Sequence, residues 1–410
     1  MGSRINTMLD DIEAGPPDPM YTLKKWADGD TCDQKADLGV GIYRNEAGVY
    51  QEMDCIKQAK VELSKQKLGH DYEVTTGNPE FLHHAARLIF SQDCSRLAAN
   101  HVASVQTISG TGANHLAVLL LAKCIVPQPK VFIGTPSWGN YKPMLDLVGL
   151  STVEYPHYDE IDRTLDFPSI LAAITSAPRN SVFIFQSCCH NPTGSDPSQE
   201  QWHELAMALR AGDHIPLFDS AYQGLGRGLE EDSFAVRLFA KLGFSMIVCQ
   251  SFSKNFGLYG ERCGALHIVC GTAEAASATQ DRLRCLIRWE FSSSPAYGSR
   301  LVNIVQSSAY LKQMWITELS AMRHRLYELR QQLYNLLSKI LKTPGHWGHI
   351  IEECGLFSFL KLSPRQCSVL IQQFHIYLPP NGRINISGLN KSNIERVARA
   401  IDYVVRLPDA

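Results

Sequence analysis

The chain has 410 residues, of which 45% are hydrophobic and 20% are charged, and its formal net charge is -2. This length predicts one large domain plus a smaller one, and the composition is that of an ordinary globular protein. The near-neutral charge excludes a general attraction to nucleic acid or to an anionic membrane, and no run of 18 apolar residues predicts a membrane-spanning helix.

The first thirty residues and the cysteines bear on where the protein works. The first thirty residues are acidic and have neither the apolar stretch of a secretory signal nor the basic character of a transit peptide, so we expect a cytoplasmic protein. The twelve cysteines are scattered and include no C-x-x-C pair. This pattern indicates neither a metal site nor a disulfide framework, and we expect free buried thiols in a reducing compartment.

Short β-branched or aromatic runs alternate with helical patterns along much of the chain. The expected strands are residues 103–108, 130–134, 181–187, 215–219 and 245–250, and the clearest expected helices are 114–126 and 200–212. Near-continuous apolar strands separated by helices predict a mostly parallel sheet that is covered on both faces. After Gly298 the pattern changes: residues 300–341 predict long helices, and the runs LFSFLKL and FHIYLPP suggest short strands of a second unit.

Four noteworthy groups fall at the carboxyl ends of predicted strands, where a parallel α/β sheet gathers its ligands. The stretch SGTGANH, residues 109–115, opens a helix, and its glycines allow the backbone to approach an anion closely. Asn191, Asp219 with Tyr222 three residues on, and Lys254 follow three further strands. Each group alone has a commoner structural explanation, namely a turn, a helix N-cap or a surface lysine.

In combination these groups match the requirements of pyridoxal 5'-phosphate. A lysine amine forms a Schiff base with the cofactor aldehyde. A carboxylate beside the pyridine nitrogen keeps that nitrogen protonated, and a phenol and an amide can hydrogen-bond the ring oxygen. A helix N-terminus with hydroxyls and an arginine suits the phosphate. The residues therefore predict a pyridoxal-phosphate enzyme.

Several segments carry a resemblance to a known family. Between Leu38 and Leu389 the motifs LGVGIYR, HDYEVTTG, SGTGA, CHNPTG, FDSAYQG, SFSKNFGLYGERCG and GRINISGL occur in order and resemble those of the aspartate aminotransferase family. The resemblance implies a fold-type I pyridoxal-phosphate transferase, with a mostly parallel seven-stranded sheet in a large domain and a smaller α+β domain. We expect residues 1–46 to form the N-terminal arm and the first part of the small domain, 47–320 the large domain and 321–410 the small C-terminal domain.

The resemblance also implies roles for the residues of the cofactor site. Lys254 would be the Schiff-base lysine and proton shuttle, Asp219 would pair with the pyridine nitrogen, and Trp138 would stack on the ring. Tyr222 and Asn191 would hydrogen-bond the ring oxygen. The phosphate ligands would be Ser109, Gly110, Thr111, Ser251 and Arg262, with Tyr72 reaching across from the neighbouring subunit of a homodimer.

Two arginines would set the substrate. Arg383 would bind the α-carboxylate, with Gly41, Asn191 and Trp138 beside that group, and Arg288 of the other subunit would grip the distal carboxylate. The expected substrates are therefore aspartate, glutamate, oxaloacetate and 2-oxoglutarate, exchanged by a ping-pong mechanism. Arg288 also has a simpler explanation as part of a solvated helix face, because DRLRCLIR holds three arginines.

Some positions depart from the family pattern. Tyr141 stands where the family usually has a histidine that supports the aspartate, and Gln186 stands where it has a second histidine, so the coupling of Asp219 to the ring would be retuned. Residues 292–295 read SSSP in place of S-N-P-P, and Met20 would replace a smaller residue over the substrate. These changes keep a second hypothesis open: a diverged enzyme of specialised metabolism that acts on an aspartate-like amino acid by decarboxylation, elimination or substitution, or carbon–carbon bond formation. A catalytically inactive binding protein is disfavoured, because every group that would contact the cofactor is present.

Overall fold

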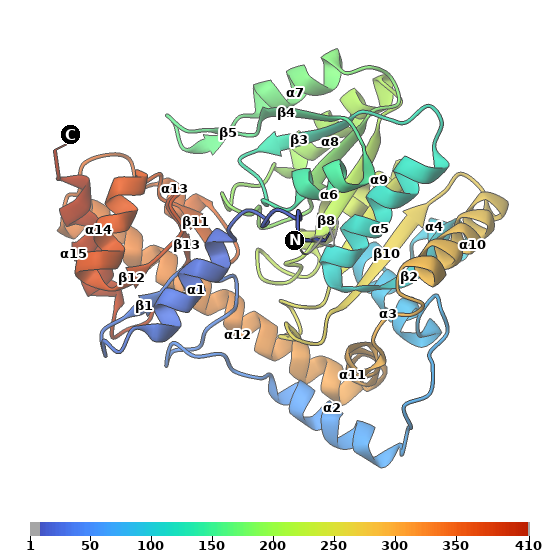
Figure 1. Ribbon diagram of the computed structural model, residues 1–410, viewed down its shortest axis with the longest axis horizontal. Helices are drawn as coiled ribbons and strands as arrows, with labels where there is room; N and C mark the ends of the chain where they lie inside the picture. Colours follow the sequence, from blue (N-terminus) through green and yellow to red (C-terminus); the bar gives the residue numbers. More distant parts are fainter. Residues whose placement is uncertain (1–8, 409–410) are drawn as a thin grey trace, which may run out of the picture.

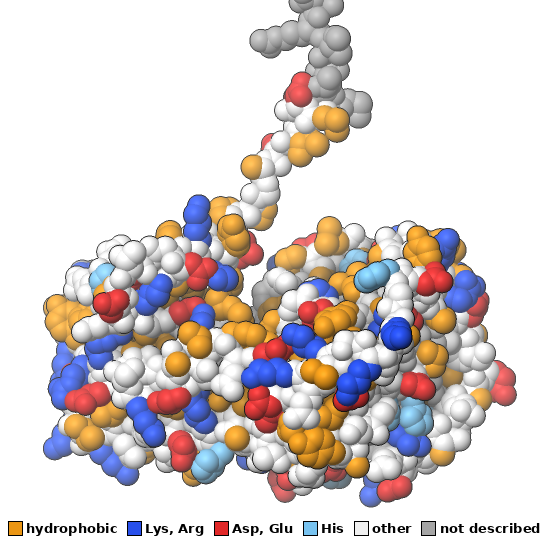
Figure 2. All heavy atoms as spheres, turned by 90° about the horizontal axis from the view of Figure 1, so that it is seen from below, with side chains coloured by type: hydrophobic (Ala, Val, Ile, Leu, Met, Phe, Trp, Pro, Cys, Tyr) orange, Lys and Arg blue, Asp and Glu red, His pale blue; other side chains and the backbone are white. Residues whose placement is uncertain are grey.

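The computed structural model describes residues 9–408 and has two lobes. The larger lobe surrounds a twisted sheet, and the smaller lobe holds the C-terminal helices together with the first helix of the chain (Figure 1). A hollow separates the two lobes on one side, where the first described residues run outward from the body (Figure 2). Within residues 9–408, no helix combines the length and the apolar character needed to cross a membrane.

The large sheet confirms the predicted fold class. Its seven strands follow the order β2-β10-β9-β8-β7-β3-β4; neighbours from β9 to β4 are parallel, whereas β10 runs antiparallel to both β2 and β9. The strands are β2 (Val102–Ile108), β3 (Val131–Thr135), β4 (Thr152–Pro156), β7 (Val182–Gln186), β8 (Ile215–Ser220), β9 (Met246–Ser251) and β10 (Cys263–Val269). β4 and β10 lie outside the predicted strands. β4 is an edge strand that ends in a proline, and β10 contains Gly264 and the buried His267, which interrupt the apolar pattern.

Helices cover both faces of the sheet. One face packs against α5 (Ser109–Cys124), α6 (Tyr141–Val148) and α10 (Ala273–Glu290), and the other against α3 (Pro79–Phe90), α7 (Phe167–Ser176), α8 (Gln199–Ala211) and α9 (Phe234–Lys241). Along β7, Val182 and Ile184 enter the first layer of core, whereas Phe183 and Phe185 enter the second. Because successive side chains of a strand point to opposite faces, a strand buried on both sides has to be apolar throughout, as predicted.

The smaller lobe is made by both ends of the chain. β1 (Ala36–Asp37) pairs with β12 (Ile376–Tyr377), and β11 (Phe357–Phe359) pairs with β13 (Arg383–Asn385). Its helices are α1 (Pro19–Gly29), α13 (His349–Glu352), α14 (Pro364–Phe374) and α15 (Ile394–Val405). The remaining short elements of the molecule are α4 (Ser95–Ala98), the hairpin of β5 (Tyr158–Asp159) and β6 (Thr164–Leu165), and the 3-10 turns η1 (Glu231–Ser233) and η3 (Ile386–Gly388). The second unit therefore contains strands and helices, as predicted.

The long helix α12 (Ala309–Tyr334) joins the two lobes and continues as a π-helical turn, η2 (Asn335–Ile340), with α2 (Asp54–Lys65) and α11 (Ala296–Ser307) beside it (Figure 1). Trp315 of α12 stacks on Phe256 with ring centroids 4.7 Å apart, and its indole N–H donates to the carbonyl of Asn255 at 2.7 Å. These contacts hold the loop after β9 that carries Lys254. The predicted domain boundary at residue 320 falls inside α12, so the division of the chain at that residue stays a prediction.

Candidate active site

A cavity of about 180 Å³ opens at the carboxyl ends of β7, β8 and β9, beside the start of α5. Most of the residues predicted for the site line it: Ser109, Gly110, Thr111, Trp138, Asn191, Asp219, Tyr222, Ser251, Lys254 and Arg262. Five further residues complete the wall, namely Asn114, Gln186, Ala221, Ser253 and Tyr259. The order of the strands explains why these residues lie together, because β7, β8 and β9 are parallel neighbours whose carboxyl ends lie at one edge of the sheet.

One end of the cavity is built to hold an anion. α5 begins at Ser109, so the first backbone N–H groups of this helix have no partner within it. Arg262 donates from Nη2 to the Ser109 hydroxyl at 2.5 Å, and the hydroxyl of Ser251 lies beside Gly110. A Cβ atom at Gly110 would lie 2.8 Å from the Cβ of Ser251, so only glycine fits this close approach. Helix dipole, hydroxyls and guanidinium together suit a phosphate.

The opposite end of the cavity holds a buried carboxylate. Asp219 at the end of β8 is 7% exposed and accepts a hydrogen bond from the Tyr141 hydroxyl at 2.7 Å. Burial raises the pKa of Asp219 to about 6, and hydrogen bonds from Tyr141 and Asn114 oppose that rise. Burial beside Asp219 also raises the pKa of Tyr141 strongly, so the phenol stays protonated and donates a hydrogen bond to Asp219. Tyr141 therefore supports the aspartate with a neutral donor.

Lys254 lies between the two ends. Its Nζ donates to the carbonyl of Gly41 at 2.5 Å and sits 4.9 Å from the ring centroid of Tyr259. Burial, together with the positive charges of Arg383 and Arg262, lowers the pKa of Lys254 to about 7. A substantial fraction of the amine is then neutral near pH 7, as a nucleophile or base requires.

Arg383, Asn191 and Gln186 form a connected group at the mouth of the cavity. Arg383 donates from Nη1 to the side-chain oxygen of Asn191 at 3.0 Å and from Nη2 to the carbonyl of Gly39 at 2.6 Å. Its buried Nε has no partner among the described residues, so this N–H is among those available to a carboxylate. Gln186 donates to the Asn191 carbonyl at 2.9 Å and accepts from the Asn191 N–H at 2.8 Å. Gln186 therefore fixes Asn191 and, unlike Tyr141, has no hydrogen bond with Asp219.

Two predicted residues lie away from this cavity. The side chain of Tyr72 is 88% exposed, and Arg288, near the end of α10, is exposed and donates to the Ser292 hydroxyl at 2.5 Å. Neither lines the cavity of its own chain. Both were assigned by resemblance to the site of a neighbouring subunit, and their roles stay predictions. Met20, by contrast, lies over the site, with its sulfur 3.8 Å from Nη2 of Arg383.

Sequence reasoning missed Tyr259 and Asn114. The Tyr259 hydroxyl accepts the backbone N–H of Tyr43 at 2.8 Å, and Asn114 donates to the Gly110 carbonyl at 2.9 Å. Both belong to segments already singled out, SFSKNFGLY and SGTGANH, and Asn114 follows Gly110 by one helical turn. The sequence signal that could have identified both residues is their position within those two motifs.

The arrangement fits pyridoxal 5'-phosphate. The cavity offers an anion site at one end, a carboxylate for a pyridine nitrogen at the other, and a lysine amine between them. Asn114 Oδ1 and Arg383 Nε are buried polar atoms without a partner among the described residues; Asn114 lines the cavity, and Arg383 contacts Asn191 of its wall. Tyr222 lines the same wall, and burial raises its pKa, so it is present as a hydrogen-bond donor.

Comparison with known proteins agrees with this chemistry. A family model described as aminotransferase class I and II matches residues 33–401. A relative from Hapsidospora irregularis described as aminotransferase tasG is 43% identical over 399 residues, which cover 97% of this chain and 96% of the relative.

Two solved structures are similar over nearly their whole length. The aspartate aminotransferase from the cytoplasm of Saccharomyces cerevisiae is 38% identical with a TM-score of 0.94, covering 97% of this chain and 98% of that chain. An aromatic-amino-acid aminotransferase from Burkholderia pseudomallei, covalently bound to pyridoxal phosphate, is 33% identical with a TM-score of 0.94, covering 98% of this chain and 100% of that one.

The lowered pKa of Lys254 predicts its reactivity in the cofactor-free protein. Because the pKa falls from the ordinary value to about 7, an amine-selective reagent should label Lys254 with a rate that rises between roughly pH 6 and 8 and then levels off. The exposed Lys57, whose pKa is raised by its hydrogen bond with Asp54, is the control and should gain reactivity only at higher pH. Peptide mapping after brief labelling measures both rates. Parallel pH profiles for the two lysines would contradict the prediction.

The Tyr141–Asp219 hydrogen bond predicts the effect of Tyr141→Phe. Loss of the donor should raise the pKa of Asp219 further, so that ionised Asp219 and tight cofactor binding are lost at a higher pH than in the unchanged protein. At neutral pH we expect affinity for pyridoxal phosphate to fall about tenfold or more, since a hydrogen bond to a charged group contributes about 1.5–3 kcal/mol. Equilibrium dialysis from pH 5 to 8 measures this.

The matched control for Tyr141→Phe is Tyr158→Phe. The hydroxyl of Tyr158 is buried without a partner among the described residues, so its removal deletes no hydrogen bond. Cofactor affinity in Tyr158→Phe should equal that of the unchanged protein. Equal affinities for all three proteins would show that Tyr141 does not support Asp219.

Proposed function

The chain belongs to the aminotransferase class I and II family, a pyridoxal-phosphate-dependent transferase family, and from this premise we propose that it exchanges the amino group between aspartate or glutamate and 2-oxoglutarate or oxaloacetate. The observation that carries the proposal is the placement of Arg383 and Lys254, which both donate to the backbone of residues 39–41. A carboxylate bound by Arg383 would therefore lie close to the lysine amine.

The cofactor would be held at both ends. Ser109, Gly110, Thr111, Ser251 and Arg262 would bind the phosphate, since they form the anion site. Asp219, supported by Tyr141, would pair with the protonated pyridine nitrogen, and Trp138 would cover the ring. Tyr222 and Asn191 are the donors available to the ring oxygen. When bound, pyridoxal phosphate withdraws electrons from the substrate Cα and makes its proton acidic.

Lys254 would move that proton. Its neutral amine would accept the proton released from the substrate Cα and would hold it for return later in the reaction. Because its pKa lies near 7, the amine gives up the proton as readily as it takes it, which is the condition for efficient general acid–base catalysis at neutral pH. The carbonyl of Gly41, 2.5 Å from Nζ, orients the amine.

Arg383 would orient both substrates of the exchange. Its guanidinium is held by Asn191 and Gly39 and lies over the ring of Phe357, 4.2 Å from the ring centroid. A guanidinium fixed in this way binds a carboxylate through two N–H groups in one orientation. The amino acid and the 2-oxo acid share that carboxylate, so one site serves both in turn. This supports a ping-pong mechanism.

Selection of dicarboxylates would depend on a second copy of the chain. Arg288 and Tyr72 are exposed and lie outside the cavity of their own chain, as expected of residues supplied across a two-fold interface. In a homodimer, Arg288 would bind the distal carboxylate of a substrate in the other site, and Tyr72 would reach the other phosphate. Similarity to the solved structure of the aspartate aminotransferase from Saccharomyces cerevisiae supports this choice of substrate.

A second candidate is favoured by the residues around Asp219. The phenol of Tyr141 and the amide of Gln186 replace the imidazoles that the family pattern would place there, and a neutral phenol alters the charge balance at the pyridine nitrogen. The relative from Hapsidospora irregularis is described as an aminotransferase without a stated substrate. Decarboxylation, elimination or substitution, or carbon–carbon bond formation on an aspartate-like amino acid is therefore the alternative reaction.

We also propose that the protein acts in the cytoplasm. The similar aspartate aminotransferase of Saccharomyces cerevisiae is named as coming from that compartment. The two amino acids and two 2-oxo acids of the proposed reaction are small anions, and neither nucleic acid nor membrane is needed as a partner.

The aspartate half-reaction distinguishes the two candidates. Holoenzyme mixed with aspartate and no 2-oxo acid should release about one oxaloacetate per active site and retain the amino group, because a ping-pong enzyme completes one half-reaction alone. Product analysis by mass spectrometry and the loss of the visible absorption of the holoenzyme measure the extent. Release of CO2, or of ammonia with pyruvate, would contradict transamination and select the second candidate.

Arg288→Ala tests the source of dicarboxylate selection. Loss of the charged partner of the distal carboxylate should lower kcat/KM for aspartate and glutamate about 100-fold or more. Phenylalanine and alanine, which lack that carboxylate, should lose far less. Arg284→Ala is the matched control: Arg284 is in the same helix, is exposed and donates to Asp281 at 2.8 Å. Equal losses for all four amino acids in Arg288→Ala would show that Arg288 does not read the distal carboxylate.

A further inference from the structure

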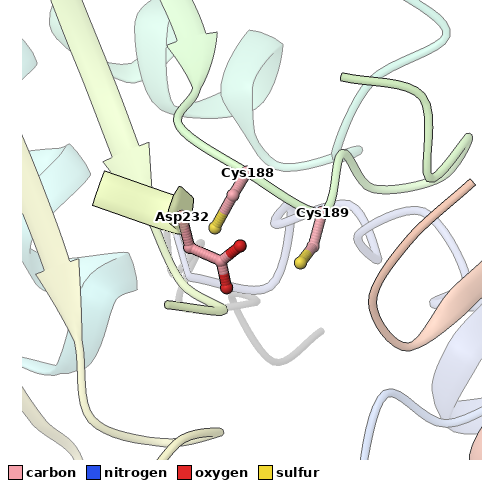
Figure 3. Close-up of side chains that lie close together, drawn as sticks. All are labelled: Cys188, Cys189 and Asp232. Carbon is pink, nitrogen blue, oxygen red and sulfur yellow. The ribbon is translucent and has the colours of Figure 1, made fainter. Parts of the chain in front are cut away.

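A second cluster of reactive side chains lies behind the loop that carries Asn191. Cys188 and Cys189 belong to the segment between β7 and α8, and Asp232 belongs to η1 (Figure 3). Asp196, further along the loop after β7, and Cys354, which precedes β11, complete the cluster. None of these five side chains lines the active-site cavity.

The cluster consists of two sets of three side chains that share Cys189. In each set the thiol and carboxylate atoms lie within 4.8 Å of one another. The first set is Cys188, Cys189 and Asp232, and the second is Cys189, Asp196 and Cys354. Figure 3 shows the first set, with the two thiols directed toward the carboxylate. Because the cluster draws on three separate segments, it exists only in the folded chain.

The two carboxylates differ in their remaining capacity to bind a ligand. Asp232 accepts backbone N–H groups from Gly224, Gly226 and Arg227 at 2.8–2.9 Å, which ties it to its own loop. Asp196 accepts two backbone N–H groups, from Cys189 at 2.6 Å and His190 at 2.9 Å. Its third contact is the Cys354 thiol, 3.0 Å from Oδ2. A proton on that thiol occupies the position that a metal ion would take.

We propose that Cys189, Cys354 and Asp196 form a binding site for a thiophilic divalent cation of the Zn²⁺ class. In a tetrahedral zinc site, bonds of about 2.3 Å to sulfur and about 2.0 Å to oxygen place the ligand atoms about 3.5–3.8 Å apart. The ligand atoms here lie within 4.8 Å, so side-chain rotations suffice to close the site. Thiolates select zinc-class ions over Mg²⁺ and Ca²⁺, which prefer all-oxygen ligands. Binding replaces two thiol protons, which pass to solvent, and no oxidation or reduction occurs.

The space around Cys189 is kept open by two glycines. A Cβ atom at Gly226 or Gly355 would lie 2.7 Å from Sγ of Cys189, so any larger residue would displace the sulfur. Cys189 itself has a φ of +54°, in the left-handed region that a residue with a side chain rarely occupies. This backbone conformation carries the thiol between Asp232 on one side and Asp196 with Cys354 on the other.

A cleft beside Cys354 gives an ion access to the proposed site. Cys354, Gly355 and Gly226 line a cleft of about 560 Å³ that shares no residue with the active-site cavity and gives water access as a fourth ligand. The wall of this cleft also carries Arg227, Arg323 and Arg330, of which Arg330 is paired with Glu353. Asp196 and Asp232 form no ion pair within residues 9–408, and Arg227 is the cation whose charge acts on Asp196. The carboxylate of Asp232 adds a further acidic group beside Cys189.

The test uses holoenzyme without an affinity tag. After exposure to Zn²⁺ and gel filtration, elemental analysis should find about one Zn²⁺ per chain, since one set of ligands holds one ion. Co²⁺ should give the intense red-region d–d bands of a tetrahedral thiolate site, where pyridoxal phosphate does not absorb, and Zn²⁺ should displace Co²⁺. Bound Zn²⁺ should also protect Cys189 and Cys354 of the unchanged protein from alkylation, which peptide mapping reads without any substitution.

Variants assign the ligands. Cys189→Ser and Cys354→Ser should each weaken Zn²⁺ binding, measured by competition with a chromophoric chelator, by about 100-fold or more, since loss of even an outer-sphere partner costs 10–100-fold. Cys188→Ser is the matched control, because Cys188 adjoins Cys189 but lies outside the proposed set, and it should keep one Zn²⁺ per chain. Thermal melting of each variant checks that it folds.

Three results would overturn the proposal. The first is unchanged Zn²⁺ content in both Cys189→Ser and Cys354→Ser. The second is an octahedral Co²⁺ spectrum with both thiols still open to alkylation. The third is a Cys189–Cys354 disulfide in the purified protein, found by mapping without reductant, which would make the pair a thiol couple instead of a metal site.

Discussion

The buried Lys254 amine is the constraint on which the site depends. The cavity holds a lysine and a carboxylate, and burial works against the charged form of each. It lowers the pKa of Lys254 to about 7 and raises that of Asp219 to about 6. Proton transfer needs the first change, because only a neutral amine accepts a proton. Pairing with a pyridine nitrogen requires an ionised Asp219, so the rise in the pKa of Asp219 has to stay small. The hydrogen bond from the Tyr141 hydroxyl limits that rise.

The surrounding structure serves to hold these two groups in place. Trp315 of α12 fixes the loop after β9 through Asn255 and Phe256, and the neighbouring Lys254 therefore projects from a rigid segment. The loop after β7 has two separate tasks. Gln186 clamps the backbone of Asn191 toward the active site, while Cys189 and Asp196 face the opposite way, toward Cys354. A single loop thus borders both the proposed transamination site and the proposed cation site.

Sequence reasoning identified much of this arrangement because the relevant physics is local. The runs that became β3, β7, β8 and β9 are apolar on both faces, and a motif with a polar residue just after such a strand places that residue at one sheet edge. β10 was missed because Gly264 and His267 break the pattern, and the pairing of His267 with Ser104 and Gln250 that makes its burial tolerable is visible only across strands. The partners of Gln186 were equally hidden, since an amide can hydrogen-bond many groups within reach.

The sequence by itself determined the fold class, the cofactor chemistry and ten of the fifteen residues that line the cavity, through strand periodicity and through short motifs that resemble those of a known family. Tertiary structure alone decided three other things. It put the Tyr141 hydroxyl on Asp219, left Arg288 and Tyr72 outside the cavity of their own chain, and brought the distant Cys354 beside Cys189 and Asp196. The physical reason is that hydrogen bonding, burial and ligand geometry depend on distances between atoms that the chain brings together only by folding, and no local pattern encodes those distances.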